Sequence, residues 1–597
     1  MPNLSKIKRL RMLDFLGELR KVHTDDESIR AFTEIENHLR DKKYGLVWEE
    51  HTEQVDEMLE ENIPIFTEDV DKKITASADG GYNFILEGDN LQSLYLLQKT
   101  HKGLIDVIYI DPPYNRGKDD FVYDDDFIDH NDTFRHSKWI SFMTTRLKIA
   151  RELLSEKGLL FVSIDDNELS ALKMVLDEIF DESCFINLFV WQRNSSAKTE
   201  KGKFTVNTEY ILLYAKSSKY VLNDAYKPLS DASMKLFKFD DGDGRGKYQT
   251  VSLQKPRDPG PETTYDYVDN NGKVWPCPPK GWRMKKEKIK ALENDGRLVL
   301  TGNSLRVKDY WNERENEGKR IDTLWNDLAQ NTAGSGELEA VMGNPNAFDN
   351  PKPTDLIKRC LRIAQSGGYV LDFFAGSGTT AHAVLELNQE DNGNRHFIIC
   401  SNNEVSEKKQ IAYFVEKGYI EAPPRKGTKK ESEWKAKWAA FKSTVEYQTE
   451  VESAEYQSLG ICHSVTYPRV STVITGVRLD GTQYSDGLPA NLKYFKCDWT
   501  PRKPEDYLLS NALCLHIREM IELQHGIEID NVHNVLILNK SDFRKYVMDD
   551  SIYPQIENIW VNQNIIFNSA EMEKLNAPGF KYIPREFFGQ ELREAAE

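Results

Sequence analysis

Hydrophobic and polar residues in the first part of the chain recur at helical spacing. Ile29, Phe32 and Ile35 lie on one face of such a helix, and Thr24 with Glu27 has the spacing of a capping box that begins it. The pattern predicts a helical region over residues 1–75.

Beyond this region the spacing changes to short apolar runs separated by amphipathic segments. In residues 76–220 the runs include "YNFILE", "DVIYI", "GLLFVSI" and "EYILLYAK", and helical spacing covers 137–157 and 168–180. The same texture returns in residues 336–404, where a helix is expected at 354–365 before "YVL" and "FIIC". This alternation predicts an α/β fold with a mostly parallel sheet and helices on its faces.

Residues 221–335 interrupt the alternation and form a separate predicted module. They are rich in Gly, Pro, Asp and Asn, and they carry 20 Lys and Arg against 18 Asp and Glu, although the whole chain has a net charge of −18. Such an acidic total weighs against nucleic-acid binding, since affinity rests on neutralised phosphates. The distribution of charge therefore matters more than the total.

Two further regions follow the second α/β block. Residues 405–460 are rich in Lys and Glu, yet Trp434, Trp438 and Phe441 recur at helical spacing and predict one amphipathic helix. Residues 461–597 mix a long amphipathic helix at 505–524 with short strands, which predicts an α+β region.

Composition limits the class of protein. A chain of 597 residues should divide into about two to four domains. No run of about 18 apolar residues is present, and the N-terminus lacks the apolar core of a signal peptide, so no membrane segment is expected. The seven cysteines are scattered without C-x-x-C spacing, which favours a reducing cytoplasm and argues against disulfides and a structural metal site.

The segment "DFFAGSGTT", residues 372–380, carries the first candidate chemistry and is called the glycine turn below. It follows the apolar run "YVL" and opens a helix, where glycines let the backbone approach a ligand and the helix N-terminus attracts an anion. This geometry suits a nucleotide-like or carboxylate-bearing cofactor, but a purely structural turn is an equally good interpretation of this segment alone. The phosphate-binding pattern G-x-x-x-x-G-K-[ST] is absent from the sequence, which argues against an ATP-driven motor.

The segment Asp111-Pro112-Pro113-Tyr114, called the DPPY loop below, is more specific. It stands where the run "DVIYI" ends, and ligands of open α/β sheets bind outside the carboxyl ends of strands. An ordinary turn could also contain these four residues, although their position at a strand end makes that alternative weaker.

The DPPY loop has the composition of a clamp for an aromatic amine. The lone pair of an exocyclic amino group is delocalised into the base, and two acceptors aimed at its hydrogens would free it for attack. Asp111 can supply one acceptor and the Pro112 carbonyl the other, while paired prolines hold both in place. The ring of Tyr114 offers a surface on which an extruded base can stack, a contact worth about 1–3 kcal/mol.

The two segments together resemble the catalytic and cofactor motifs of S-adenosylmethionine-dependent DNA amino-methyltransferases. Asp at position 111 resembles the adenine-N6 enzymes, and the order of the segments resembles the permuted β group. The resemblance implies a Rossmann-like class I methyltransferase sheet, doubly wound, mixed and circularly permuted, with an inserted target-recognition module and helical or α+β terminal regions.

Further pieces are similar to Mod subunits of type III restriction-modification systems. These include "EGDNLQSL", "NTEYILLYAK", "NPKPTDLIKR" and "VTYPRV", in order over most of the chain. The resemblance implies duplex DNA as substrate, a separate Res subunit with helicase and nuclease activity, and a homodimer. The chain departs from the family at 405–460, which is either a docked interaction helix or a surface insertion without function.

The resemblance also implies residues that bind S-adenosylmethionine. They are Asp89, Asn90, Lys352, Pro353, Asp372, Phe373, Phe374, Gly376, Gly378 and Glu404. Asp89 would accept from the adenine amino group and the glycine turn would hold the methionine part, while Asn402 could replace Glu404 at the ribose. Asp89 could instead be a helix N-cap, and Lys352 a solvated charge.

Recognition of the DNA sequence is expected in residues 221–335. A solvated helix face is the commoner fate of such a charge run taken alone, but its setting beside Trp282 and Gly-rich loops in the inserted segment favours contact with phosphates or guanine edges. The candidates are Arg245, Lys247, Arg257, Arg283, Lys285 and Lys286.

The sequence thus predicts a site-specific enzyme that transfers a methyl group to adenine N6 in duplex DNA without a metal. One alternative is a recognition subunit that chiefly guides a separate nuclease-motor. Another keeps the chemistry but changes the target to cytosine N4, as in an orphan methyltransferase, or to RNA.

Overall fold

The computed structural model describes most of residues 12–40 and thirteen longer segments of the chain. These are 53–76, 80–117, 135–195, 204–227, 234–256, 260–301, 304–314, 319–345, 347–364, 367–425, 427–501, 516–576 and 578–584, with 122–123, 126–127 and 587 as short pieces. Within them, no helix is both long enough and apolar enough to cross a lipid bilayer.

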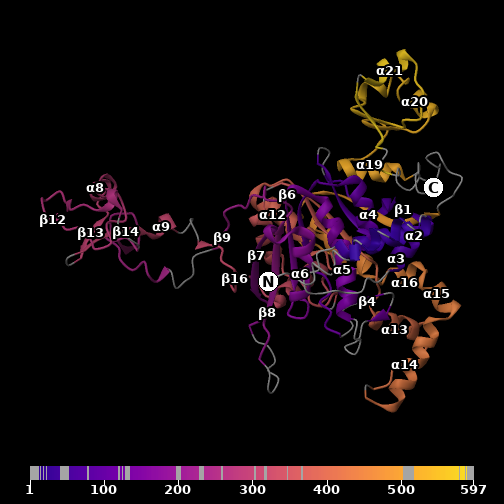
Figure 1. Ribbon diagram of the computed structural model, residues 1–597, viewed down its shortest axis with the longest axis horizontal. Coiled ribbons are helices and arrows are strands. Elements are labelled where there is room, and N and C mark those ends of the chain that lie inside the picture. The colour runs from indigo at the N-terminus through magenta and orange to yellow at the C-terminus, as the bar shows by residue number, and fades with distance from the viewer. Residues whose placement is uncertain are drawn as a thin grey trace.

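A ten-stranded sheet forms the centre of the molecule (Figure 1). Its strands, in spatial order, are β1 (Asn62–Glu68), β19 (Asn491–Pro501), β2 (Tyr82–Glu87), β18 (Arg395–Ser401), β17 (Gly368–Asp372), β3 (Ile105–Ile110), β6 (Leu154–Ile164), β8 (Thr208–Ala215), β7 (Phe185–Gln192) and β16 (Leu324–Trp325). The run from β19 to β6 is parallel, and β8 is antiparallel to both of its neighbours.

The order of the strands in space differs from their order in the chain. β17 and β18 follow β3 by more than two hundred residues in sequence, yet both lie between β2 and β3 in the sheet. The predicted α/β sheet, doubly wound, mixed and permuted, is confirmed.

Helices cover both faces of the sheet and enclose two separate cores. One face carries α4 (Asn90–Thr100), α5 (Arg135–Leu153), α6 (Leu169–Phe180) and α19 (Ile517–His525). The other carries α10 (Asn331–Met342), α11 (Thr354–Ile363), α12 (Thr379–Asp391) and α17 (Tyr467–Thr475). Alternate residues of β3 enter the two cores, with Ile108 in the first and Val107 in the second. Burial on both faces explains why this strand is apolar apart from Asp106 near its start.

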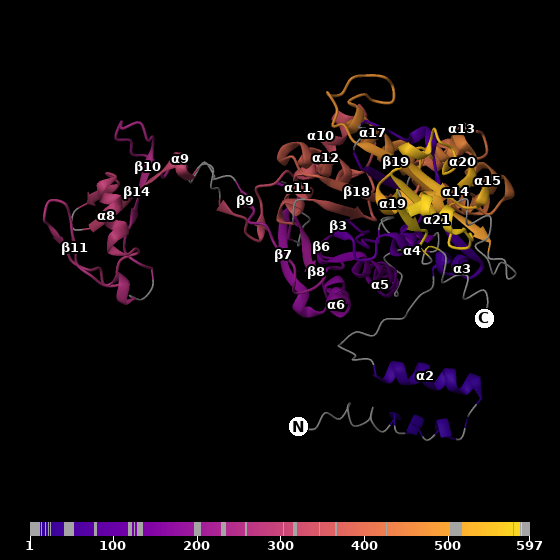
Figure 2. The same cartoon turned by 90° about the horizontal axis from the view of Figure 1, so that it is seen from above.

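The prediction that residues 1–75 are helical is wrong for 62–68. Helices α2 (Asp26–Arg40) and α3 (Gln54–Glu61) are present, but β1 follows α3 directly and pairs antiparallel with β19. β1 is an edge strand, and Pro64 is tolerated there because one side of such a strand needs no ladder hydrogen bonds. Figure 2 shows α2 apart from the sheet.

The described part of 221–335 contains a small folded module that stands away from the sheet (Figure 1). Its elements are β10 (Tyr248–Ser252), β11 (Tyr267–Val268), β12 (Val274–Trp275), α8 (Lys286–Asn294), β13 (Leu298–Thr301), β14 (Ser304–Tyr310) and α9 (Trp311–Arg314). Trp275, Trp282 and Ile289 are buried in its own core. Trp282 is therefore a packing residue of the module.

The predicted end of the module at residue 335 lies too far along the chain. A short ribbon of β9 (Tyr226–Lys227) and β15 (Lys319–Arg320) joins the module to the body. Beyond it, β16 pairs with β7 in the main sheet, and Trp325 is buried in the second core. Residues 324–335 thus belong structurally to the sheet and its helices.

The amphipathic helix expected in 405–460 is present as α14 (Lys429–Lys442). It packs on α13 (Glu407–Glu416), and α15 (Val445–Val451) and α16 (Ala454–Gln457) complete a helical unit. Phe414 of α13 contacts both Trp438 and Phe441. The aromatic face of α14 is thus occupied within the chain.

The last region divides between the main sheet and a small separate unit. β19 and α17 belong to the body, whereas β20 (Asn534–Ile537), α20 (Lys540–Tyr546), β21 (Asn558–Val561), α21 (Ser569–Asn576) and β22 (Gly579–Tyr582) form a parallel three-stranded unit with its own core. Of the expected helix 505–524, residues 517–524 are helical in α19, and most of the preceding part lies outside the described residues.

Candidate active site

The DPPY loop and the glycine turn lie at the same edge of the sheet, at the ends of neighbouring strands. Asp111 directly follows β3, and Asp372 is the last residue of β17. The two strands pair in parallel, with Leu371 opposite Ile108. Both segments therefore leave the sheet side by side at its carboxyl edge, where open α/β sheets bind ligands.

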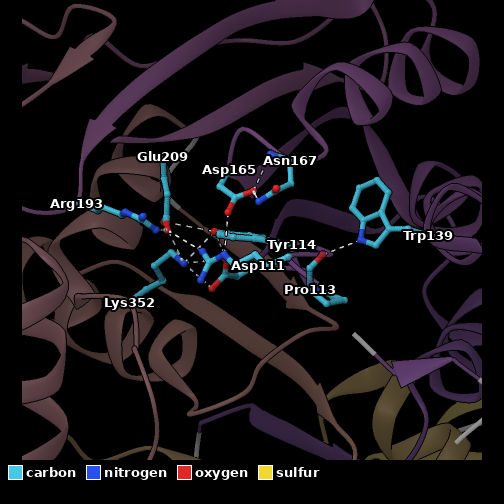
Figure 3. A network of polar contacts seen from close by, with 10 residues as sticks. Asp111, Pro113, Tyr114, Trp139, Asp165, Asn167, Arg193, Glu209 and Lys352 are labelled. Atoms are coloured by element: carbon cyan, nitrogen blue, oxygen red, sulfur yellow. Dashed lines mark hydrogen bonds and ion pairs between the residues drawn. The ribbon is translucent and has the colours of Figure 1, made fainter. Parts of the chain in front are cut away.

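The carboxylate of Asp111 is held by two donors (Figure 3). Lys352 Nζ donates to its Oδ1 and Oδ2 at 2.9 and 2.8 Å, and the Tyr114 hydroxyl donates to Oδ1 at 2.6 Å. The side chain of Asp111 keeps 29% of its surface exposed, against 9% for Lys352. Asp111 is thus fixed in orientation but still accessible to a ligand.

A buried glutamate on β8 lies behind this pair. Glu209 Oε2 is 3.4 Å from Lys352 Nζ, and Arg193 donates to Oε1 at 2.8 Å. Burial alone would raise the pKa of Glu209, but Lys352 and Arg193 outweigh it and lower that pKa. Burial likewise opposes the charge of Lys352, and the carboxylates of Asp111 and Glu209 nevertheless raise its pKa.

Glu209, Arg193 and Arg116 are functional-site residues that the sequence analysis missed. Their positions come from β8, from the end of β7 and from the residues after the DPPY loop, so only the folded sheet brings them together. The one available signal was "NTEYILLYAK", a family-like piece whose acidic residue lies within an apolar strand.

The proline carbonyls have separate roles. The Pro113 carbonyl accepts from Trp139 Nε1 at 2.7 Å, and Trp139 is fully buried in α5. This bond anchors the loop to the first core. Among the described residues none donates a hydrogen bond to the Pro112 carbonyl, which fits its predicted role as the second acceptor.

The ring of Tyr114 is covered in this structure. Tyr114 is only 6% exposed, and the Arg116 guanidinium lies over its ring at 4.8 Å from the centroid. Arg116 is held there by Asp165, whose Oδ2 accepts from Nε at 2.8 Å. The predicted stacking of a base on Tyr114 therefore requires Arg116 to move.

The carboxylate of Asp372 shapes its own loop. Phe374 N donates to Oδ1 at 2.9 Å, and the Thr380 hydroxyl donates to Oδ2. Asp372 is 3% exposed, and burial raises its pKa to about 7. The carboxylate thus ties the start of the glycine turn to the helix that follows.

The glycines of the turn adopt left-handed backbone conformations. Gly376 has φ 49° and Gly378 has φ 76°, and Gly378 is the N-cap of α12. A Cβ added to Gly378 would lie 3.3 Å from Val470 Cγ2 and 3.4 Å from the Thr466 carbonyl. Glycine is therefore favoured here by the left-handed backbone, and an added Cβ would also make close contacts.

The C-terminal region contributes an unpredicted support to the glycine turn. The Thr466 hydroxyl donates to the Gly376 carbonyl at 2.6 Å, and Arg469 donates to Thr379 Oγ1 at 2.7 Å and Ser377 Oγ at 3.1 Å. Arg469 is fully buried. The segment "VTYPRV" thus acts on the predicted cofactor loop, although the charged region 405–460 separates the two in sequence.

Asp89 and Asn90 lie at the end of β2 and also act locally. Asp89 Oδ1 caps α4 by accepting from the amides of Leu91 and Gln92 at 2.7 and 3.4 Å. Asn90 Nδ2 donates to the Phe373 carbonyl at 3.0 Å. The N-cap alternative for Asp89 is therefore realised, and Asn90 braces the glycine turn.

Two other residues assigned to the cofactor lie elsewhere or have other contacts. Lys352 contacts Asp111, Tyr114 and Glu209, so its side chain is directed at the DPPY loop. Pro353, the next residue, is the N-cap of α11. The place of Lys352 in the cofactor pocket stays a prediction beside these contacts. Glu404 is exposed, and its carbonyl accepts from Ile461 N at 3.0 Å, which ties the end of the helical unit to the sheet.

Two of the candidate basic residues of the module form ion pairs. Arg245 pairs with Asp243 at 3.0 Å and donates to the Asp295 carbonyl at 2.9 Å, so it holds loops of the module together. Lys285 pairs with Glu262 at 2.8 Å. Lys247, Arg283 and Lys286 are exposed, whereas Arg257 lies outside the described residues.

A family model for DNA methylases, N6_N4_Mtase, matches residues 105–448 of the chain. The chain belongs to this family. It is 36% identical over 385 residues to the StyLTI Mod subunit, a type III restriction-modification enzyme of Salmonella typhimurium, with 58% of each chain covered. It is also 33% identical to the type II methyltransferase M.KpnI of Klebsiella pneumoniae, covering 56% of this chain and 84% of that protein.

The DNA methylase chain spans about three fifths of the length of the Mod subunits it matches, 58% for StyLTI and 60% for EcoP15I of Escherichia coli. Among solved structures, a putative DNA modification methylase of Thermus thermophilus complexed with S-adenosyl-L-methionine is 13% identical, with a TM-score of 0.27 over 56% of this chain and 95% of that one. The predicted resemblance to DNA amino-methyltransferases and to Mod subunits is confirmed by the family model and the curated relatives.

Proposed function

We propose that this DNA methylase transfers a methyl group from S-adenosylmethionine to N6 of adenine in duplex DNA, as the modification and recognition subunit of a type III system. The observation that carries the proposal is the pairing of β3 with β17, which sets Asp111 beside the glycine turn. The names of the similar Mod subunits support the type III assignment.

The clamp for the amino group consists of Asp111 and the Pro112 carbonyl. The carboxylate accepts one N–H of the amine and the carbonyl accepts the other, which draws the nitrogen toward tetrahedral geometry and frees its lone pair. Once the nitrogen has taken the methyl group, it loses one of its protons to the solvent. Lys352 and Tyr114 donate hydrogen bonds to the carboxylate and hold it in place. Preorganised acceptors of this kind need no reorganisation during the reaction.

The residues of the glycine turn fit S-adenosylmethionine. Bound there, this cofactor would supply the methyl group of its sulfonium, and loss of that methyl group turns the sulfonium into a neutral thioether. Left-handed Gly376 and Gly378 bring backbone close to a ligand, and the N-terminus of α12 suits a carboxylate. Asp89, 40% exposed, caps α4 through Oδ1 and keeps Oδ2 as an acceptor for an amino group.

Adenine is the proposed target because the DPPY loop begins with Asp111 and because the chain resembles Mod subunits. The matching family includes both N6 and N4 in its name, so cytosine N4 is the second candidate. Exposed Arg283 and Lys286 of the separate module support its proposed role in DNA binding. A Res partner and a homodimer follow from the same resemblance.

Nucleoside analysis tests this function directly. The purified full chain is incubated with methyl-labelled S-adenosylmethionine and duplex DNA, and the digested product is separated by chromatography. The expected label is in N6-methyladenine, without any partner protein. Label in N4-methylcytosine would move the target to cytosine, and DNA binding without any label would leave only the guiding role.

A further inference from the structure

The ammonium group of Lys352 contacts four oxygen atoms of the protein. Its ammonium group is 2.9 and 2.8 Å from the two oxygens of Asp111, 3.0 Å from the Tyr114 hydroxyl and 3.4 Å from Glu209 Oε2. All four partners belong to the DPPY loop or to β8. The ammonium thus lies between two carboxylates.

The backbone that carries Lys352 is fixed by close packing. A Cβ on Gly334 of α10 would lie 2.3 Å from the Pro351 carbonyl, so the two backbones touch without an intervening side chain. Glu337 of the same helix accepts from Thr354 N at 2.9 Å. Prolines on both sides of Lys352 restrict the chain further. The position of the Lys352 backbone is therefore set by the scaffold, and the four contacts of the ammonium group fix the side chain.

Glu209 is the second carboxylate, and it is more deeply buried than Asp111. Its side chain is 3% exposed, and its cations are Lys352 at 3.4 Å, Arg193 at 2.8 Å and Arg116 at 3.5 Å. The Tyr114 hydroxyl, 3.4 Å away, also joins it to Asp111. Without Lys352, the two carboxylates would still share the Tyr114 hydroxyl, and Asp111 would lose its cation while Glu209 kept its two arginines.

Other ionisable groups face this pair from the neighbouring strands. Asp372 on β17 and Tyr109 on β3 both feel the charge of Asp111. Asp165 accepts from Arg116 and so takes up part of its charge. Asp372 and Asp165 are carboxyl groups and Tyr109 is a neutral phenol, so among the groups named here Lys352 is the cation that contacts Asp111.

We propose that Lys352 is a positioning residue that pairs with the Asp111 carboxylate and orients it for the target amine, and that Glu209 holds Lys352 in turn. This inference rests on the proposed function, since it assigns Asp111 as the acceptor. A carboxylate accepts an N–H more strongly than a protonated carboxyl does, and a cation between two carboxylates favours the charged form of both. The raised pKa of Lys352 and the lowered pKa of Glu209 agree with this arrangement.

The test is the pH–rate profile of methyl transfer by the full chain at saturating cofactor. In Lys352→Met the two carboxylates repel each other, so the acid limb should move upward by roughly one to three pH units. The Lys352→Met/Glu209→Gln double variant removes that repulsion, and its acid limb should return toward the wild-type position. Lys352→Arg keeps the charge and should shift the limb less than Lys352→Met.

Lys358→Met is the matched control. Lys358 lies in α11 and pairs with Glu386 and Glu390, away from the DPPY loop, so its profile should stay in place. Cofactor binding by Lys352→Met should remain within about twofold of wild type. The positioning role is overturned if Lys352→Met has a lower rate at every pH without a shift of the acid limb. It is also overturned if the variant loses affinity for the cofactor and its acid limb does not shift.

Thermal unfolding supplies a readout that does not depend on catalysis. In Lys352→Met one carboxyl has a raised folded-state pKa, so the stability it contributes is present at low pH and lost as pH rises through that pKa. The deficit in Tm relative to wild type should grow from pH 5 to pH 8 and shrink in the double variant. A wild-type chain that transfers no methyl group refutes the proposed function, whereas a deficit independent of pH refutes the role of Lys352.

Discussion

Asp111 and Asp372 stand at the ends of adjacent parallel strands, although they lie far apart in the chain. Their strands are in register from Val370 opposite Val107 to Leu371 opposite Ile108. The amine clamp and the glycine turn therefore share one edge of the sheet. A cofactor held by the turn and a base held by the clamp would be neighbours.

Gly378→Ala should weaken cofactor binding. The new Cβ meets Val470 and the Thr466 carbonyl, and φ 76° strains any residue with a side chain, at a cost of about 1–3 kcal/mol. Calorimetric titration with S-adenosylmethionine should show an affinity reduced about tenfold or more. Gly336→Ala in α10 is the control, because a Cβ there meets nothing within 4 Å. Equal affinities for both variants would contradict a role of the turn in binding.

Arg469→Met should lower cofactor affinity with little change in Tm. The variant loses the hydrogen bonds to Thr379 and Ser377 that hold the glycine turn. It also removes a buried charge. Burial lowers the pKa of Arg469 to about 10, which shows that the charged form is costly at this place. Removal of that cost should offset the loss of the hydrogen bonds. Arg478→Met, which loses bonds to carbonyls of α10, serves as control. Unchanged affinity in Arg469→Met would separate the C-terminal region from the cofactor site.

Asp372→Asn should change the pH dependence of stability. The folded-state pKa of about 7 lies above the ordinary value near 4, so the stability from this carboxyl is complete below about pH 4 and lost as pH rises through 7. In the wild type, the free energy of unfolding should fall by roughly 1.4 kcal/mol for each pH unit in this range. The uncharged variant should not lose this stability. Thermal unfolding from pH 4 to 8 should show the variant gaining on wild type, and parallel curves would contradict the raised pKa.

The module within residues 221–335 should show two classes of basic residue if it binds DNA as proposed. Arg283→Ala and Lys286→Ala remove exposed charges, and each lost phosphate contact should reduce the salt dependence of DNA binding by about 0.9 in the slope of log K against log salt. Arg245→Ala breaks the pairing with Asp243 and should lower stability without changing the slope. Titrations of duplex DNA at several salt concentrations measure both. A slope change confined to Arg245→Ala would reverse the assignment.

The sequence predicted the elements that follow from local patterns. The run "DVIYI" and the run "YVL" became β3 and β17, and the glycine turn and the DPPY loop lie at their ends as expected. These predictions succeed because burial on both faces leaves a continuous apolar run in a strand. The aromatic spacing of Trp434 and Trp438 predicted α14 for the same kind of reason.

The contacts that complete the site were beyond local patterns. Glu209 and Arg193 come from strands on the far side of β6, and Arg469 comes from beyond the helical unit, so only tertiary structure brings them to the two loops. Lys352 was assigned to the cofactor, yet a long flexible side chain can reach either loop from one backbone position. β1 was missed because a short edge strand follows α3 without a turn signal.

Methyl transfer by Asp111→Ala, measured beside its binding of S-adenosylmethionine, tests the central claim most directly. Loss of the acceptor should reduce transfer to duplex DNA by at least about a hundredfold, the effect of removing one preorganised polar group from an active site. The affinity for the cofactor should stay within about twofold of wild type, because no hydrogen bond or ion pair joins Asp111 to the glycine turn among the described residues. Near-normal transfer by this variant would contradict the amine clamp.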